Sequence, residues 1–293
     1  MEAIPKLRFL KSSNKNLEFE IFPLSRLFAR DEKLPVPLHV PQRLEFFNVL
    51  VITRGSGVHF IDFEPYTFTA GDIIFVSKGQ AQAFKASPDH DGFLLLFTES
   101  FVSKNLIDAD VLSFYRLYNY HLQFPVVRPN KAEAEKIKSL AENIYTEYGY
   151  SDDFAKEDIL RVMLKLLLLK AERIKHTVIP QELSSEALIS FSTFQNLLEQ
   201  FIAETRNAKD YAHKMHISYK HLNEICKSVT GNTAKEVIDN FLVLEIKRNL
   251  AVTDIPVKEL AYKLGFDEPT NFVKYFKRQT EQTPTQFKKS LAD

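Results

Sequence analysis

The stretch that decides the fold lies near the carboxyl terminus, where residues 256–280 read PVKELAYKLGFDEPTNFVKYFKRQT. Apolar residues recur at spacings of three and four on both sides of Gly265, which predicts two short helices joined by a tight turn. Pro256 is tolerated in the first turn of the first helix, and Asp267 is a candidate N-cap of the second, expected over 268–280. Two such helices, with polar residues on the outer face of the second, are typical of a helix-turn-helix unit.

A second unit with the same pattern precedes it in residues 208–230, which read AKDYAHKMHISYKHLNEICKSVT. The pattern predicts helices over 208–215 and 219–230, and Ser218 stands where the N-cap of the second helix belongs. Gly231 follows and can end that helix in the left-handed conformation, which glycine adopts without strain. Two helix-turn-helix units are therefore expected in this part of the chain.

A long helix, expected over 234–252, connects the two units. A helix of about 19 residues is about 28 Å long at 1.5 Å per residue. Successive major-groove faces on one side of B-DNA are about 34 Å apart. The second helices of the two units, the recognition helices, can therefore enter neighbouring major grooves, and the sequence predicts a non-palindromic DNA site read by one chain.

Residues 191–293 resemble the DNA-binding domain of the AraC/XylS family of bacterial transcription regulators. The most specific matches are the run 257–266 (VKELAYKLGF), Phe272, the run 275–278 (YFKR) and Thr283-Pro284. The first unit matches more loosely, through Ser218, Leu222, Gly231 and residues 244–250. Cys226 departs from the family, which has an aromatic residue there, and Glu281 stands where the family has glycine. We expect Glu281 to strain a left-handed cap by about 1 kcal/mol.

By position in the motif, the resemblance implies which residues contact DNA. The base-contacting positions are Lys220, Asn223 and Glu224 in the first unit and Pro269, Thr270, Val273 and Lys274 in the second. Lysine can donate to guanine, asparagine can pair with adenine, and glutamate can accept from cytosine. Lys227, Lys277 and Arg278 are also expected on DNA, the last two on phosphate. Charge alone would not indicate DNA, because residues 191–293 hold 15 Lys and Arg against 13 Asp and Glu.

The amino-terminal part reads as strands from Leu17 to about Phe101. Short apolar runs rich in β-branched and aromatic residues alternate with turns, which indicates an antiparallel sandwich or barrel. This part resembles the cupin-like sensor domain of the same family. The chain is thus expected to be an α+β multidomain protein: a cupin-like antiparallel β-barrel (1–125), a helical dimerisation segment (126–176), a linker (177–188) and an all-α DNA-binding domain with two helix-turn-helix units (189–293).

The barrel is expected to hold a small-molecule effector rather than a metal. Residues 71–79 resemble the second cupin motif, but Ser77 and Gln82 stand where cupin enzymes have proline and a metal-binding histidine. The clustered histidine pair of the first cupin motif is also missing, and His39, His59 and His90 are scattered. We therefore expect no metal, no cofactor and no enzymatic activity. Effector pockets are mostly apolar with a few polar anchors, and the candidates here are Phe47, Asn48, His59 and Gln82.

Two helices are expected between barrel and linker, over 135–148 and from Asp152 or Asp153 to about Lys175. The apolar surface of the second is wider than one stripe, so it is expected to pack on two sides. One side would meet its own domain. A second copy of the chain would cover the other in a homodimer, although packing within the domain explains the pattern equally well.

The whole chain has 293 residues, zero formal net charge and one cysteine, which excludes a disulfide framework and a Cys-rich metal site. It has no secretory signal and no apolar run of the about 20 residues that a bilayer requires, so a cytoplasmic location is expected. The expected partners are double-stranded DNA, a second copy and an effector, with RNA polymerase as a further candidate. Two alternatives remain: a dimeric DNA-binding regulator without a ligand, and a metal-dependent cupin enzyme.

Overall fold

The structure, a computed structural model, describes most of the chain. The described residues are 6–7, 9, 17–31, 34, 36–85, 90–103, 125–151, 154–178, 185–252 and 255–290. The chain forms two compact units that divide near residue 181. Among the described helices, none combines the length and apolar character that crossing a bilayer requires.

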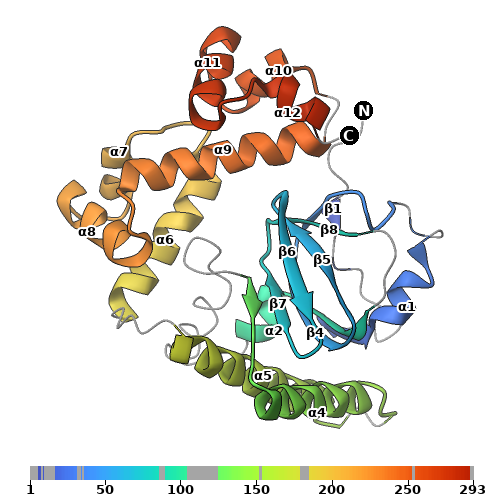
Figure 1. Ribbon diagram of the computed structural model, residues 1–293. Helices are drawn as coiled ribbons and strands as arrows, with labels where there is room; N and C mark the ends of the chain where they lie inside the picture. Colours follow the sequence, from blue (N-terminus) through green and yellow to red (C-terminus); the bar gives the residue numbers. More distant parts are fainter. Residues whose placement is uncertain are drawn as a thin grey trace. The chain divides into compact units, whose positions relative to one another are not determined.

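The amino-terminal unit contains two five-stranded sheets (Figure 1). The first runs β1-β3-β8-β5-β6, with β1 Lys6–Leu7, β3 Gln42–Leu44, β8 Ala81–Phe84, β5 Ser56–Ile61 and β6 Glu64–Thr69. The second runs β10-β7-β4-β9-β2, with β10 Val126–Val127, β7 Ile73–Val76, β4 Phe47–Arg54, β9 Asp91–Phe97 and β2 Phe19–Pro23. Apart from the parallel β1–β3 pair, the described strands pair in antiparallel fashion, as the sequence predicts.

Two apolar clusters arrange this unit in three layers. One cluster lies between the two sheets and joins residues such as Ile61 and Phe84 of the first sheet to Leu50 and Leu94 of the second. The other lies between the second sheet and two helices, α4 (Lys131–Tyr148) and α5 (Lys156–Val178). Short helices α1 (Leu24–Phe28) and α2 (Glu99–Ser103) complete the unit.

Helix α4 begins four residues before the expected start because Asn130 and Glu133 form a reciprocal capping box. The Asn130 side chain accepts from the Glu133 backbone N–H, and the Glu133 carboxylate accepts from the Asn130 backbone N–H. Asp152 and Asp153, the expected caps of the next helix, lie outside the described residues.

The carboxyl-terminal unit is helical throughout its described part. Its helices are α6 Ser185–Phe201, α7 Ala208–Lys214, α8 Tyr219–Thr230, α9 Ala234–Val252, α10 Val257–Lys263, α11 Pro269–Thr280 and α12 Pro284–Ser290. The expected bounds of α8 and α9 are confirmed. Figure 1 shows α8 near the end where the long helix α9 begins, whereas α11 lies over the middle of α9 and α12 lies near its other end.

Two details of the sequence interpretation are wrong. The expected linker over 177–188 includes helical residues at both ends: 177–178 belong to α5 and 185–188 to α6. The apolar face of α6 already begins at Leu188, which is buried together with Phe191, and this burial favours helix over linker. Asp267 is not the N-cap of α11; Glu268 occupies that position without a capping side-chain bond, and Pro269 starts the helix.

Candidate nucleic-acid interface and effector cavity

Helix α8, the expected recognition helix of the first unit, has one buried and one exposed face. Ser218 caps it as expected, since its Oγ accepts from the His221 backbone N–H at 3.1 Å. The residues of the buried face are Leu222, Ile225, Cys226 and Val229. Lys220, Glu224 and Lys227 are exposed, and the Lys220 Nζ lies 3.9 Å from the Glu224 carboxylate. A pair this exposed is weak in water, so both side chains remain available to a duplex.

Asn223, expected to contact a base, has a second role. Its Oδ1 accepts from the Ala234 backbone N–H, the first residue of α9, at 2.8 Å. This bond fixes the junction between α8 and α9 and leaves the side chain only partly exposed. The side-chain NH₂ is the part of Asn223 that can donate to a base acceptor.

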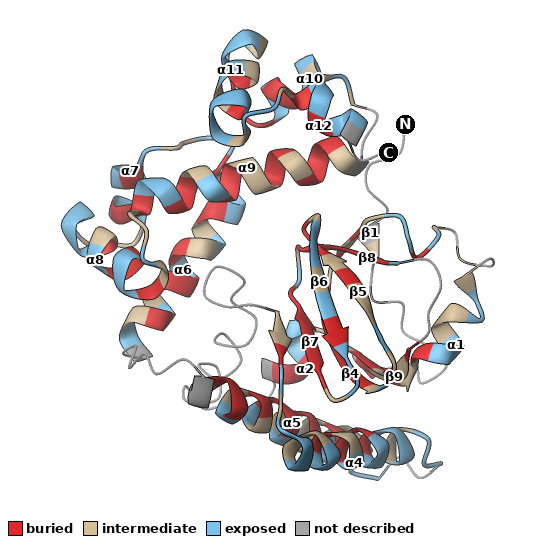
Figure 2. Ribbon diagram, in the orientation of Figure 1, coloured by how far each residue is buried: buried red, intermediate tan, exposed pale blue. Residues whose placement is uncertain are grey.

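Helix α11 shows the same division into two faces. Phe272 and Phe276 are buried, Pro269 and Val273 are partly buried, and the exposed residues expected on DNA are Thr270, Lys274, Lys277 and Arg278. Figure 2 shows exposed residues along the outer faces of α8 and α11, whereas α9 is mostly buried or intermediate. The unit therefore presents two polar helix faces, one on α8 and one on α11.

Side-chain contacts hold α11 against α9. The Tyr275 hydroxyl donates to the Asp239 Oδ1 at 2.9 Å, which anchors the middle of α11 to α9. Burial, together with the charge and hydrogen bond of Asp239, raises the pKa of Tyr275, so this hydroxyl keeps its proton over the whole physiological range. The Arg278 guanidinium lies 5.6 Å from the centre of the Tyr275 ring.

The turn between α10 and α11 is fastened to the segment after α6. Gly265 has φ +73°, and a Cβ there would lie 1.8 Å from the Ala203 carbonyl oxygen, so only glycine fits. The Arg206 guanidinium stacks 3.6 Å from the centre of the Phe266 ring and donates to the Leu264 carbonyl at 2.7 Å. These contacts place both helix-turn-helix units in one rigid framework.

Arg206 also lines a polar hollow beside α11 that the sequence did not reveal. The hollow has a volume of about 380 Å³, and its charged lining residues are Arg206, Asp267, Lys274 and Arg278. Three cations against one carboxylate are suited to a phosphate group. Arg206 is far from Lys274 in sequence, so neither helical periodicity nor the motif could connect them.

In the amino-terminal unit, strand alternation decides which candidates face the cavity. Along β4, Val49 and Val51 point toward the helices, whereas Leu50 and Ile52 point between the sheets. Phe47 belongs to the helix-facing set and stacks on Phe97, with ring centres 5.9 Å apart. The expectation that Phe47 lines the cavity is therefore wrong, because adjacent strand residues face opposite sides.

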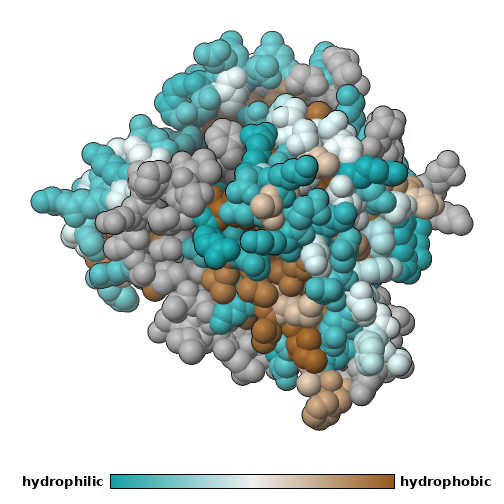
Figure 3. Space-filling model, turned by 60° about the horizontal axis from the view of Figure 1, so that its bottom comes forward, coloured by the Kyte–Doolittle hydropathy of each residue, from teal (hydrophilic) through white to brown (hydrophobic). Residues whose placement is uncertain are grey.

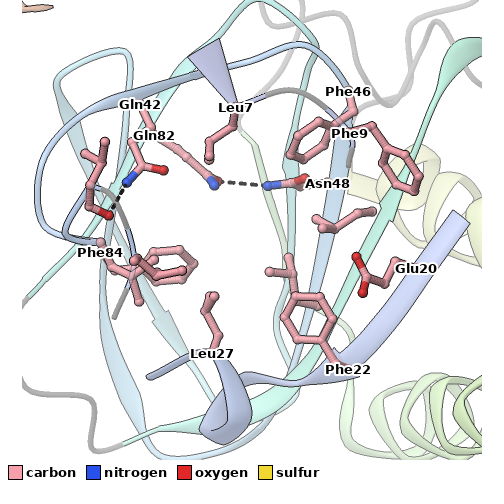
Figure 4. A pocket seen from close by; sticks show the side chains of 15 residues that line it. Leu7, Phe9, Glu20, Phe22, Leu27, Gln42, Phe46, Asn48, Gln82 and Phe84 are labelled. Carbon is pink, nitrogen blue, oxygen red and sulfur yellow. Dashed lines mark hydrogen bonds between the residues drawn. The ribbon is translucent and has the colours of Figure 1, made fainter. Parts of the chain in front are cut away.

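Asn48 does line a cavity, which lies between the two sheets and has a volume of about 190 Å³ (Figure 4). Its polar lining residues are Glu20, Gln42, Asn48 and Gln82. The apolar ones are Leu7, Phe9, Phe22, Leu27, Leu34, Val36, Leu38, Phe46, Phe84, Leu94 and Leu96. Three amides and one carboxylate thus stand in an otherwise apolar wall.

Gln82 contacts both Asn48 and His59 through its side-chain oxygen. Its Oε1 accepts from the Asn48 Nδ2 at 3.1 Å and lies 3.3 Å from the His59 Nε2. His59 is fully buried behind the wall rather than in it, and burial lowers its pKa to about 4. The imidazole is therefore neutral at pH 7, and the bond to Gln82 assigns its proton to Nε2.

Glu20 is the cavity residue that sequence reasoning missed. It lies on β2, whose residues Phe19 and Ile21 face the helices, so Glu20 and Phe22 face the cavity. β2 pairs with β9, and the paired residues lie 70 to 78 positions apart along the chain. The single signal in the sequence is a charge between two apolar residues in FEIF (19–22), too weak to identify without the pairing.

The three candidate histidines of the amino-terminal unit do not share one environment. His39 is exposed, whereas His59 and His90 are buried, with the His90 ring stacked edge-on against Phe68. Over the described ranges of the chain, no three His, Cys, Asp or Glu residues come together as metal ligands would.

Each of the two units matches a known protein domain. Residues 26–162 match the AraC-like ligand binding domain, and residues 211–290 match a helix-turn-helix domain. The chain is 23% identical to the HTH-type transcriptional activator RhaS of Shigella dysenteriae over 97% of its own length and 96% of the relative's. RhaS of an Escherichia coli strain is also 23% identical, over 87% of this chain and 90% of the relative.

Solved structures give weaker likenesses. ToxT from Vibrio cholerae is 13% identical, with a TM-score of 0.46 over 94% of this chain and 98% of ToxT. The DNA-binding domain of AdpA, solved with a target DNA, is 23% identical over 34% of this chain and 90% of that domain, with a TM-score of 0.32. The two family matches and the RhaS relatives agree with the residues described above: the chain belongs to the AraC family, and it is a DNA-binding transcription regulator with an amino-terminal ligand-binding domain.

Proposed function

We propose that one chain binds one DNA duplex with α8 and α11 in successive major grooves, and that an effector in the cavity controls this binding. The observation that carries the proposal is the pair of exposed polar faces on α8 and α11, two helices that both contact α9. Each face is held by contacts to α9: the Asn223–Ala234 bond for α8 and the Tyr275–Asp239 bond for α11. A helix held in this way can deliver its side chains to base edges in a fixed register.

Roles follow for the individual side chains. We assign base contacts to Lys220, Asn223 and Glu224 on α8 and to Pro269, Thr270, Val273 and Lys274 on α11. Lys227, Lys277 and Arg278 would hold the duplex backbone, joined by Arg206 across the hollow beside α11. Phosphate contacts set register and contribute most of the salt dependence, whereas base contacts give specificity.

A homodimer is the proposed form in solution, and α5 is its proposed interface. Four large apolar residues on α5 are exposed and follow one another at spacings of three, four and three: Ile159, Val162, Leu166 and Leu169, which we call the α5 seam. This is the spacing of a two-helix coiled-coil contact. Figure 3 shows hydrophobic residues gathered on the face that brings α4 and α5 forward.

Further parts of the proposal rest on the relatives. RhaS is named as an activator, so we propose that this chain activates transcription by contacting RNA polymerase beside its DNA site. Such a role places the protein in the cytoplasm and requires no catalytic activity and no metal. Control by the effector requires a ligand with different affinity for two states of the chain.

The test is selection of DNA from a random pool by the purified full-length chain, followed by footprinting of the enriched sequence. We expect two different boxes on one face of the duplex, with centres about 10 bp apart. Lys220→Ala should weaken protection of one box and Lys274→Ala that of the other, each by roughly 5- to 100-fold in affinity, the cost of about 1–3 kcal/mol for one base contact. A single protected box, or no enriched sequence, would contradict the proposal.

A further inference from the structure

The barrel cavity carries an inference about the chemistry of the effector, and it rests on the proposed function of that cavity. We propose that the effector is a small, mostly apolar molecule of about one ring that presents a protonated amine to Glu20.

The wall first excludes a polyhydroxylated effector. Most of the lining is Leu, Phe and Val, and such surface offers no partners to hydroxyl groups that leave water. A polar group that is buried without a hydrogen-bond partner loses its bonds to water and gains none in return. A molecule with several hydroxyls would therefore lose affinity in this cavity, whereas an apolar body gains by leaving water.

The amides of the wall already bond to the protein. The Gln42 Nε2 donates to the carbonyls of Val36 and Pro37 at 3.2 and 3.0 Å. The Gln82 Oε1 accepts a hydrogen bond from the Asn48 Nδ2 and lies 3.3 Å from the His59 Nε2. These bonds fix the orientation of the three amide side chains in the wall.

Glu20 differs from the amides. Within the described part of the chain, no hydrogen bond or ion pair to its carboxylate is formed, and Figure 4 shows that carboxylate beside Phe22 at the edge of the cavity. Burial raises the pKa of Glu20, and the positive charges of Arg26 and Arg30 oppose the rise. Both arginines are exposed and neither lines the cavity, so they act on Glu20 only through their field.

A carboxylate in an apolar wall selects for the charge of its ligand. An ammonium group would replace the water that Glu20 loses and form a charge-assisted hydrogen bond, roughly twice as strong as a neutral one. A ligand carboxylate would place two negative charges together, which disfavours binding. The preferred order is therefore amine, then alcohol, then acid.

The volume limits the size of the ligand. An engineered apolar cavity of about 150 Å³ accommodates benzene, and this cavity, of about 190 Å³, is only somewhat larger. One ring with a two-carbon arm matches that space. Three probes share this body and differ only in the terminal group: 2-phenylethylamine, 2-phenylethanol and phenylacetate.

The experiment measures binding of the three probes to the full-length chain by titration calorimetry at pH 7.5 without DNA. We expect 2-phenylethylamine to bind at least tenfold more tightly than 2-phenylethanol, and phenylacetate to bind most weakly. Equal affinities, tightest binding of phenylacetate, or no binding of any probe would overturn the inference. This comparison uses the unaltered chain, so it does not depend on how a variant folds.

Two variants test whether Glu20 causes the preference for the amine. Glu20→Gln keeps the shape of the side chain and removes its charge, and it should weaken the amine at least tenfold while changing the alcohol less than twofold. Glu64→Gln removes a carboxylate from the exposed side of β6 and should change neither. An unchanged amine affinity in Glu20→Gln would overturn the assignment. DNA selection without any probe tests the proposed function separately, so failure of one proposal leaves the other measurable.

Discussion

At the scale of single residues, His59 couples the stability of the amino-terminal unit to pH. Burial lowers the pKa of His59 to about 4, while an unfolded histidine has a pKa near 6.5. As the pH falls from about 6.5 to 4, His59 becomes protonated in the unfolded state but stays neutral in the folded state. The free energy of unfolding should therefore fall over this window, by up to roughly 3 kcal/mol.

Urea unfolding at pH 7 and at pH 4.5 checks this prediction. His59→Gln should flatten the dependence on pH whatever it does to stability at pH 7, because the titrating group is gone. His39→Gln is the matched control, since His39 is exposed and should leave the dependence unchanged. An unaltered slope in His59→Gln would show that other groups carry the pH response.

The two helix caps Gly231 and Glu281 allow a second comparison between single residues. Both adopt left-handed conformations, with φ of +76° and +62°, at corresponding ends of α8 and α11. A non-glycine residue in this conformation costs about 1 kcal/mol. Glu281→Gly should therefore raise the free energy of unfolding of the carboxyl-terminal unit by about 1 kcal/mol.

Gly231→Ala is the reverse experiment. A Cβ at Gly231 has no atom within 4 Å, so any loss of stability comes from the backbone alone. We expect a loss of about 1 kcal/mol in thermal or urea unfolding. If both variants unfold like the unaltered chain, backbone strain is not what separates the two caps.

At the scale of elements, the α5 seam predicts how the chain associates. Val162 lies at its centre and is 66% exposed, so Val162→Glu should leave the fold of one chain intact. A charge in the middle of an apolar helix–helix contact is costly, and the dimer should dissociate at least tenfold more readily. Sedimentation velocity over a range of protein concentrations measures the change.

Ser139→Glu supplies the control for the seam. It adds the same charge at an exposed position of α4 and should leave the dimer unaffected. Monomers of the unaltered chain at tens of micromolar, or equal effects of the two variants, would contradict the assignment of α5 as the interface.

Elements defined by local pattern could be predicted, and those defined by distant pairing could not. Helices α8 and α9 follow from apolar spacing, Ser218 and Gly231, all of which act within a few residues. The cavity depends on which strands lie side by side. β2 brings Glu20 to the cavity only because it pairs with β9, and no short-range signal in the sequence indicates that pairing.

The same contrast separates the two groups of candidate residues. The candidate DNA-binding positions of α11 lie on one helix, so a motif and a period of 3.6 place them together. Phe47 and Asn48 are neighbours on one strand, and a period of two sends them to opposite faces. An error of one residue in the expected facing of a strand is therefore enough to choose the wrong side chain.

At the scale of the whole molecule, the separation of the two reading helices should fix the separation of the two DNA boxes. Helix α9 holds α8 through Ala234 and α11 through Asp239. Both residues lie in one continuous helix, so no adjustable segment separates these two contacts. Inserting 5 bp between the boxes turns the second box about half a helical turn away. Only one helix-turn-helix unit could then bind its box, and affinity should fall at least tenfold.

Combining the 5-bp insertion with Lys274→Ala tests whether the loss of affinity arises from coupling of the two units through α9. A chain that has already lost its contact in the second box has less to lose from the insertion, so the two changes together should cost less than their sum. Fluorescence anisotropy with the four combinations of chain and duplex measures the cycle at one fixed salt concentration, because phosphate contacts make every affinity depend on salt. Strict additivity, or full affinity for the spaced duplex, would mean that the two units read DNA independently and that α9 does not set their spacing.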